Sequence, residues 1–185
     1  KGVFATRIAY VTKGNGRYTL RITDADGEGG QVPLTSPDPI ISPAWSPDGR
    51  ELAYVSFETR KAVIWVQDMA SGTRRQVANY KGTNSAPAWS PDGRELAVTL
   101  SRDGGSQIFM MGRDGSNARR VSQGSAINTE ATFAPDGKTL YFVSDRGGSP
   151  QIYKQAVAGG NAERVTFIGS HNISPDISPD GRTLA

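Results

Sequence analysis

The sequence predicts an all-β protein, a β-propeller built from four-stranded blades. The first observation is an internal repeat: an apolar strand, a Pro-Asp-Gly turn and a second apolar strand return every 44 residues, with the turn glycine at Gly49, Gly93, Gly137 and Gly181. The second is that a 44-residue repeat has room for four short strands, and this is the usual length of a four-stranded propeller blade. The third is that no long stretch shows the 3.6-residue periodicity of an amphipathic helix.

The Pro-Asp-Gly turn accounts for the first two strands of each unit. Proline presets φ at the second turn position, aspartate suits the third, and glycine accepts the left-handed conformation that closes a hairpin. An aromatic residue ends the first strand in three copies, at Trp45, Trp89 and Phe133. Because these residues share one position of the repeat, we expect them to form the core between blades.

The third and fourth strands follow at fixed positions of the same repeat. The third strand is expected at Ile64-Trp65, Ile108-Phe109 and Ile152-Tyr153, and the fourth at Gln76-Val77, Arg120-Val121 and Arg164-Val165. One β-propeller domain is therefore predicted over residues 1–185, with partial blade units at 1–41 and 174–185 and whole units at 42–85, 86–129 and 130–173. The two partial units could close on each other as a four-bladed ring, or the chain could be an arc of a larger propeller; the sequence leaves both open.

Composition argues against several kinds of chemistry. The chain has no cysteine and one histidine, His171, so no disulfide, transition-metal site or cysteine nucleophile is expected. Neither a Gly-x-Ser-x-Gly elbow nor a Gly-rich phosphate loop is present. Asp24-Ala25-Asp26-Gly27 resembles the start of a calcium loop but lacks the glutamate that completes one, so it is interpreted as a hairpin. We predict a protein that is not an enzyme and that uses no cofactor and no metal.

Neither the charge nor the hydropathy of the sequence indicates nucleic-acid binding or a membrane-spanning segment. The net charge is +3, and the charged residues are scattered through the predicted hairpins rather than gathered in one basic segment. No apolar run approaches the roughly 18 residues of a membrane-spanning helix. Neither nucleic-acid binding nor a membrane span is therefore predicted.

The connections from each fourth strand to the next first strand, which we call the crossovers, form the candidate binding site. Because antiparallel strands alternate in direction, the crossovers should share one face with the hairpins that join second and third strands. The Pro-Asp-Gly turns should lie on the opposite face. The crossover sequences vary around a constant asparagine at Asn84, Asn128 and Asn172. Variable loops on a rigid scaffold are typical of binding sites, whereas asparagine is also a common turn cap, and both interpretations stay open.

These segments resemble the TolB-type β-propeller family. The resemblance is carried by Pro-Ala-Trp-Ser-Pro-Asp-Gly-Arg-Glu-Leu-Ala-Tyr-Val-Ser at 43–56, the opening 1–11, the crossover Asn128-Thr129-Glu130, and the segments 150–154 and 164–169. It implies a periplasmic protein with an N-terminal α/β domain and a six-bladed propeller. It further implies membership of the Tol–Pal system of the Gram-negative cell envelope, which supports outer-membrane integrity and cell division.

The resemblance also implies partners and contact residues. The family's propeller binds the peptidoglycan-associated lipoprotein Pal at the mouth of its channel, some colicins exploit that site, and TolA contacts an N-terminal segment, so TolA binding is not expected of this chain. Carried over to this sequence, the Pal-facing positions are Thr83, Asn84, Ala86, Asn128, Thr129 and Glu130, with Ile40, His171 and Asn172 in neighbouring crossovers. Glu130 would be the charged anchor. The family's pattern has a histidine where this chain has Thr83, which puts that contact in question.

Two other functions are compatible with the repeat. An accessory propeller of a serine peptidase, gating access to a catalytic domain, would carry a similar repeat. A sugar-binding or calcium-binding propeller would need matched acidic or aromatic residues on one face of every blade, and the crossovers do not show them.

Overall fold

The computed structural model describes residues 6–185, and strands, turns and loops make up this part of the chain, with no helix. Residues 1–5, the start of the first predicted blade unit, lie outside the described part. The strands are β1 (Arg7–Gly14), β2 (Arg17–Asp24), β3 (Gln31–Ser36), β4 (Ile40–Trp45), β5 (Glu51–Ser56), β6 (Val63–Asp68), β7 (Arg74–Ala78), β8 (Asn84–Trp89), β9 (Glu95–Leu100), β10 (Gln107–Gly112), β11 (Arg119–Arg120), β12 (Asn128–Phe133), β13 (Thr139–Ser144), β14 (Gln151–Ala156) and β15 (Glu163–Arg164).

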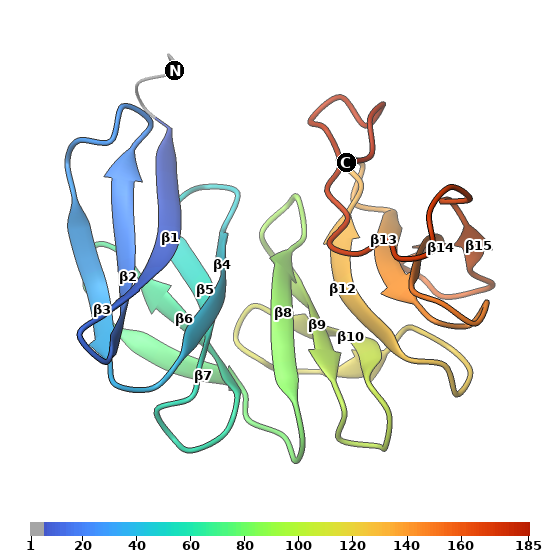
Figure 1. Cartoon of the computed structure of the whole chain (residues 1–185), viewed down its shortest axis with the longest axis horizontal. Helices are drawn as coiled ribbons and strands as arrows, with labels where there is room; N and C mark the ends of the chain where they lie inside the picture. Colours follow the sequence, from blue (N-terminus) through green and yellow to red (C-terminus); the bar gives the residue numbers. More distant parts are fainter. Residues whose placement is uncertain (1–5) are drawn as a thin grey trace.

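The strands form four antiparallel sheets that stand side by side as the blades of a β-propeller (Figure 1). Three sheets have four strands, in the orders β4-β5-β6-β7, β8-β9-β10-β11 and β12-β13-β14-β15. Their first strands, β4, β8 and β12, pack beside one another and form the inner wall. The predicted fold class is confirmed, although the fourth strands β11 and β15 are only two residues long.

The two ends of the described chain do not join. The first sheet contains only β1, β2 and β3. The segment that corresponds to one more inner strand, near Ile177, forms a single bridge with Leu184 rather than pairing with β1. Of the two arrangements that the sequence leaves open, the described residues adopt the open arc.

Three of the four Pro-Asp-Gly turns are closed by a serine and an aspartate acting together. In the turn after β4, the Gly49 N–H donates to the Ser46 carbonyl at 2.8 Å, and Gly49 has a φ of 69°. The Ser46 hydroxyl donates to Asp48 at 2.7 Å, and the same carboxylate accepts the backbone N–H of Arg50 at 3.0 Å. These two bonds hold the pKa of Asp48 below its usual range.

The core lies between the blades, as the aromatic positions predict. Trp89 and Phe133 are each 8% exposed and sit in two separate apolar clusters. The Trp89 cluster draws on the sheets that contain β5 and β9, and the indole N–H of Trp89 donates to the Ala44 carbonyl of the preceding blade at 3.0 Å. The inner strand β8 is thus fixed to β4 by packing and by this bond.

Every complete blade has a β-bulge in its inner strand, which the sequence analysis did not predict. The register between inner and second strand shifts between Ile41 and Ala44, and again between Ser85 and Ala88 and between Thr129 and Thr132. One extra residue in the inner strand bends it and leaves backbone groups outside the ladder. The bulges fall where the inner strands meet the candidate site.

Candidate partner-binding face

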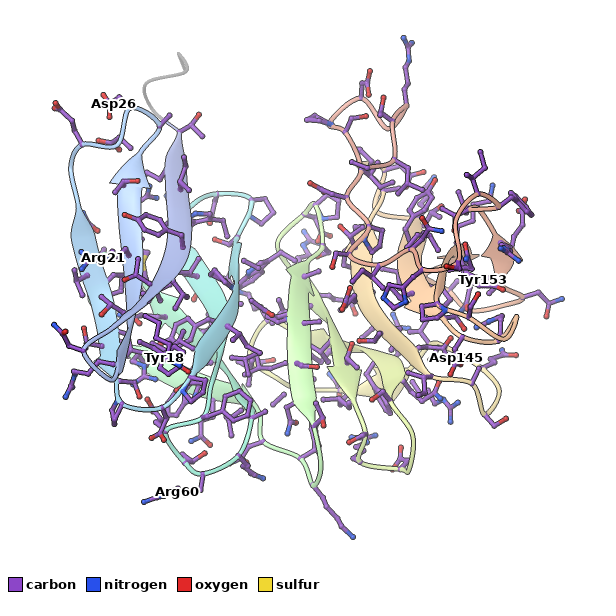
Figure 2. All side chains as sticks on the ribbon, in the orientation of Figure 1. Tyr18, Arg21, Asp26, Arg60, Asp145 and Tyr153 are labelled. Atoms are coloured by element: carbon purple, nitrogen blue, oxygen red, sulfur yellow. The ribbon has the colours of Figure 1, made fainter. Side chains whose placement is uncertain are left out.

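The crossovers and the hairpins between second and third strands share one face, as predicted. The Ser101 N–H donates to the Thr83 carbonyl at 3.1 Å, and the Thr83 N–H donates to the Ser101 hydroxyl at 2.7 Å. In the next blade, Ile127 and Asp145 make an equivalent pair of bonds. In Figure 2, Arg60 and Asp145 lie at the lower end of the blades, while Asp26 lies at the upper end with the opposite hairpins.

A cavity of about 560 Å³ opens along the inner strands where the bulges occur. It is lined by Ile41, Ser42, Pro43, Ser85, Ala86, Pro87, Thr129, Glu130, Ala131, Ser174 and Pro175. The cavity therefore includes three of the predicted contact residues, Ala86, Thr129 and Glu130. Glu130 is the one charged residue among those that line it.

One residue in each cavity-lining segment has a left-handed backbone without being glycine. Ser42, Ala86, Glu130 and Ser174 have φ values of 54°, 50°, 53° and 52° and stand 44 residues apart. Such a conformation costs on the order of 1 kcal/mol for a residue with a side chain. Four equivalent strained positions around one cavity mark a surface whose backbone is held in place by the surrounding blades.

Glu130 is joined to both neighbouring blade units. Its backbone N–H donates to the Thr99 hydroxyl at 3.2 Å, and the Thr129 hydroxyl lies 3.3 Å from the same oxygen. Its carboxylate Oε2 accepts the N–H of Ser174 at 2.8 Å and the Ser174 hydroxyl at 2.9 Å. The half-buried carboxylate is thereby fixed on the cavity wall, where it can receive a donor or a cation from a partner.

The crossover asparagines act mainly as turn caps. Asn84 and Asn128 are 0% exposed, so their side chains are not available to touch a partner. The Asn84 amide donates to the carbonyls of Ala62 and Tyr80, at 3.1 and 2.9 Å, and its oxygen accepts the Tyr80 N–H at 2.9 Å. The capping interpretation of these two residues is therefore the one that the geometry favours.

Two glutamines that the sequence analysis missed complete the caps in the later blades. Gln107 Oε1 accepts from the Asn128 amide at 2.8 Å and from the Ser122 hydroxyl at 2.7 Å. Gln151 makes the matching bonds with Asn172 and Thr166, at 2.9 and 2.7 Å. The signal was present in the repeat, because both glutamines begin a third strand 44 residues apart.

The remaining predicted residues divide by exposure. Thr83 and His171 are exposed, and Asn172 is half-buried. Ile40 is 1% exposed and packs in the core with Leu52 and Tyr54, so it presents no surface to a partner. Its neighbour Ile41 is 42% exposed and lines the cavity, because successive side chains of a strand point to opposite faces.

An ion pair fixes the hairpin that follows β5 on this same face. Arg74 donates to both carboxylate oxygens of Glu58 at 3.1 Å and to the Tyr54 hydroxyl at 2.6 Å, and its guanidinium lies 4.2 Å from the Trp65 ring centre. Burial raises the pKa of Tyr54 to about 12. The phenol therefore stays protonated and can donate to Gln67, at 2.9 Å.

The segment that resembles the start of a calcium loop forms an ordinary turn in the structure of residues 6–185. The described residues contain no group of three or more histidine, cysteine, aspartate or glutamate side chains placed to hold a metal ion. The Gly27 N–H donates to the Asp24 carbonyl at 2.9 Å, which makes Asp24–Gly27 a hairpin turn. None of the described segments is a helix long and apolar enough to cross a membrane.

Comparison with protein families gives one match over the whole chain, to the TolB beta propeller domain, residues 1–185. The Tol-Pal system protein TolB of Polaromonas naphthalenivorans is 64% identical over 86 residues, which are 46% of this chain and 20% of that protein. The protein of the same name from Chromobacterium violaceum is 60% identical over 85 residues, with the same coverage. The matched region is thus a small part of these relatives.

Comparison with solved structures agrees with the sequence matches. TolB from Acinetobacter baumannii superposes with a TM-score of 0.93 at 45% identity, over 100% of this chain and 47% of that one. A puromycin-hydrolysing peptidase of Mycobacterium tuberculosis superposes with a TM-score of 0.67 at 13% identity, over 85% of this chain and 26% of that one. The second likeness is one of fold alone and does not favour a peptidase accessory role.

Proposed function

The chain belongs to the TolB beta propeller family, and from this premise we propose that it is a non-enzymatic interaction scaffold of the Tol–Pal system that binds Pal through its crossover face. Its relatives carry the name of that system. Pal is the lipoprotein partner that the system's name and the family resemblance both point to. On this proposal the protein works in the periplasm and supports outer-membrane integrity and cell division.

The observation that carries the proposal is the wall of the cavity at Thr129 and Glu130. There a carboxylate is fixed by hydrogen bonds on the wall of a cavity that is lined by four left-handed residues. A rigid, concave surface with one fixed charge suits a protein partner, because little conformational entropy is lost when it binds. Ala86 and the exposed Ile41 add small and apolar contact surface beside it.

The predicted contact set is narrowed accordingly. Ala86, Thr129 and Glu130 are proposed as direct contacts, with the exposed Thr83 and His171 and the half-buried Asn172 at the rim. Asn84 and Asn128 are proposed to act indirectly, by fixing the crossovers that carry these residues. The exposed Ile41 replaces the buried Ile40 in the proposed set of contact residues. The proposed mechanism is rigid presentation, in which a few residues supply most of the affinity.

A calorimetric titration of this chain with the soluble domain of Pal tests the proposal. We expect saturable binding that Glu130→Ala weakens by about 1 kcal/mol or more, roughly fivefold in Kd. Glu130→Gln keeps an acceptor for Ser174 and removes the charge, so it separates recognition from loop geometry. Glu28→Ala, the same change in an exposed hairpin on the opposite face, is the matched control and should bind like the wild type.

Two results would count against the proposal. One is the absence of binding by a chain that circular dichroism shows to be folded. The other is an equal loss of affinity in the Glu130 and Glu28 variants, which would place the contact elsewhere. A loss in Glu130→Ala but not in Glu130→Gln would keep the site and assign Glu130 a positioning role in place of a charged contact.

A further inference from the structure

We infer that Thr99 is a positioning residue for this site: its hydroxyl holds the Thr129–Glu130 segment of the next blade in the conformation offered to the partner. Thr99 lies in β9, outside every crossover, and none of the predicted contact residues is in that strand. The inference rests on the proposed function and deepens it, because it names a residue that decides how the charged anchor is presented.

Thr99 is the exception at its position of the repeat. The equivalent residues of the other three blades are Val11, Val55 and Val143. Valine suits a second strand buried on both sides, and Thr99 is itself only 1% exposed. A buried hydroxyl is unfavourable unless it forms hydrogen bonds. Its presence in one blade alone therefore calls for local partners, and those that it finds belong to the next blade.

Both partners of the hydroxyl are in the bulge of β12. Thr99 Oγ1 accepts the N–H of Glu130 at 3.2 Å and lies 3.3 Å from Thr129 Oγ1. A hydroxyl has one hydrogen and two lone pairs, so it can accept the first bond and donate the second. Glu130 has a φ of 53°, a conformation that is unfavourable for a residue with a side chain. The Thr99 bond offsets part of that strain at this blade alone.

The Glu130 side chain in turn binds Ser174, in the segment that corresponds to one more inner strand. Its carboxylate Oε2 holds Ser174 through two hydrogen bonds, at 2.8 and 2.9 Å. Ser174 has the same left-handed backbone, with a φ of 52°. Hydrogen bonds thus run from Thr99 through Glu130 to Ser174 along the cavity wall. Among the described residues, all the hydrogen bonds to this carboxylate end on Oε2, so Oε1 can accept a hydrogen bond from a partner.

The test replaces the hydroxyl by a methyl group. Thr99→Val restores the residue found in the other blades and keeps the shape of the side chain. We expect it to weaken Pal binding about threefold to tenfold, the loss of one net hydrogen bond, while the melting temperature stays close to that of the wild type. Amide exchange at Glu130, followed by NMR, should become faster. Thr99→Ser keeps the hydroxyl and should restore both properties.

A double-variant cycle separates positioning from general destabilisation. If Thr99 acts through Glu130, then Thr99→Val has no further effect on Pal affinity in a Glu130→Ala background. An equal effect in both backgrounds would overturn the inference, and so would wild-type affinity of Thr99→Val for Pal. If the folded wild-type chain does not bind Pal at all, both the proposed function and the inference are overturned. If the wild-type chain binds Pal but the variants do not behave as predicted, only the inference is overturned.

Discussion

A serine hydroxyl paired with an aspartate carboxylate closes three of the four Pro-Asp-Gly turns. Ser90 donates to Asp92 at 2.7 Å and accepts the Glu95 N–H at 3.0 Å, and Ser178 and Asp180 repeat the arrangement. The hydroxyl bond is the main reason that the pKa of Asp92 lies below its usual range. In the third turn Ala134 stands at the serine position, and the alanine has no hydroxyl with which to make either bond.

Ala134→Ser should therefore stabilise the protein. The new hydroxyl would donate to Asp136 and accept the N–H of Thr139, as its counterparts do in the other turns. We expect the free energy of unfolding to rise by about 0.5–1 kcal/mol, the net value of an added hydrogen bond. Urea unfolding measures it. Ser90→Ala is the reverse change and should lower the same quantity by a similar amount; no difference in either variant would mean that the hydroxyl has no stabilising role.

Sequence reasoning proposed a site at the crossovers, but it did not predict how the side chains there are oriented. It placed Ile40 at the site, and the strand buries Ile40 and exposes Ile41. It could not choose between capping and binding for Asn128, because the buried partner, Gln107, lies in a strand 21 positions earlier. The left-handed backbone of Ala86 and Glu130 had no sequence signal, since glycine is absent from both positions.

At the scale of whole elements, a buried carboxylate links two neighbouring blades. Glu51, at the start of β5, has a side chain that is 7% exposed and binds Arg75 of its own blade at 2.7 Å. It also pairs with Arg113, from the hairpin that follows β10 in the next blade. Arg75 in turn donates to the Arg113 carbonyl at 3.2 Å. Glu95, the same position one blade later, is 41% exposed and lies 3.6 Å from Arg119.

Removing the charge of Glu51 should destabilise this blade junction. We expect Glu51→Gln to lower the free energy of unfolding by about 1–2 kcal/mol, because it weakens two charge-assisted hydrogen bonds in a largely buried place. Glu95→Gln is the matched control, and an exposed pair of this kind should change stability by less than about 0.5 kcal/mol. Equal urea midpoints for the two variants would show that burial gives the Glu51 pairs no added strength.

The strands themselves were predictable, and the bulges were not. A repeated turn motif fixes the first two strands of each blade, and apolar pairs at constant spacing mark the third. The repeat also predicted the fourth strands. In two blades these strands are only two residues long, Arg119–Arg120 and Glu163–Arg164. A bulge depends on how the second strand and the next blade constrain the inner strand, and these are contacts between residues far apart in the sequence.

At the scale of the whole molecule, the chain is an open arc of propeller blades with its inner strands on one side (Figure 1). It covers 47% of the TolB structure from Acinetobacter baumannii. The bulged inner strands of the arc, with Ser174 and Pro175, line one cavity that extends from Ile41 to Pro175. The proposed Pal-binding surface therefore lies within the described blades, on the face opposite the Pro-Asp-Gly turns.

Hydrogen exchange of this chain with and without a saturating amount of the soluble domain of Pal tests that claim most directly. If Pal binds at the crossovers, exchange should become slower in the segments 83–86 and 127–130 and stay unchanged in the turns at 46–51 and 90–95. Slower exchange confined to those turns would contradict binding at the crossovers, because it would place Pal on the opposite face. Unchanged exchange everywhere, in a chain shown to be folded, would also contradict it.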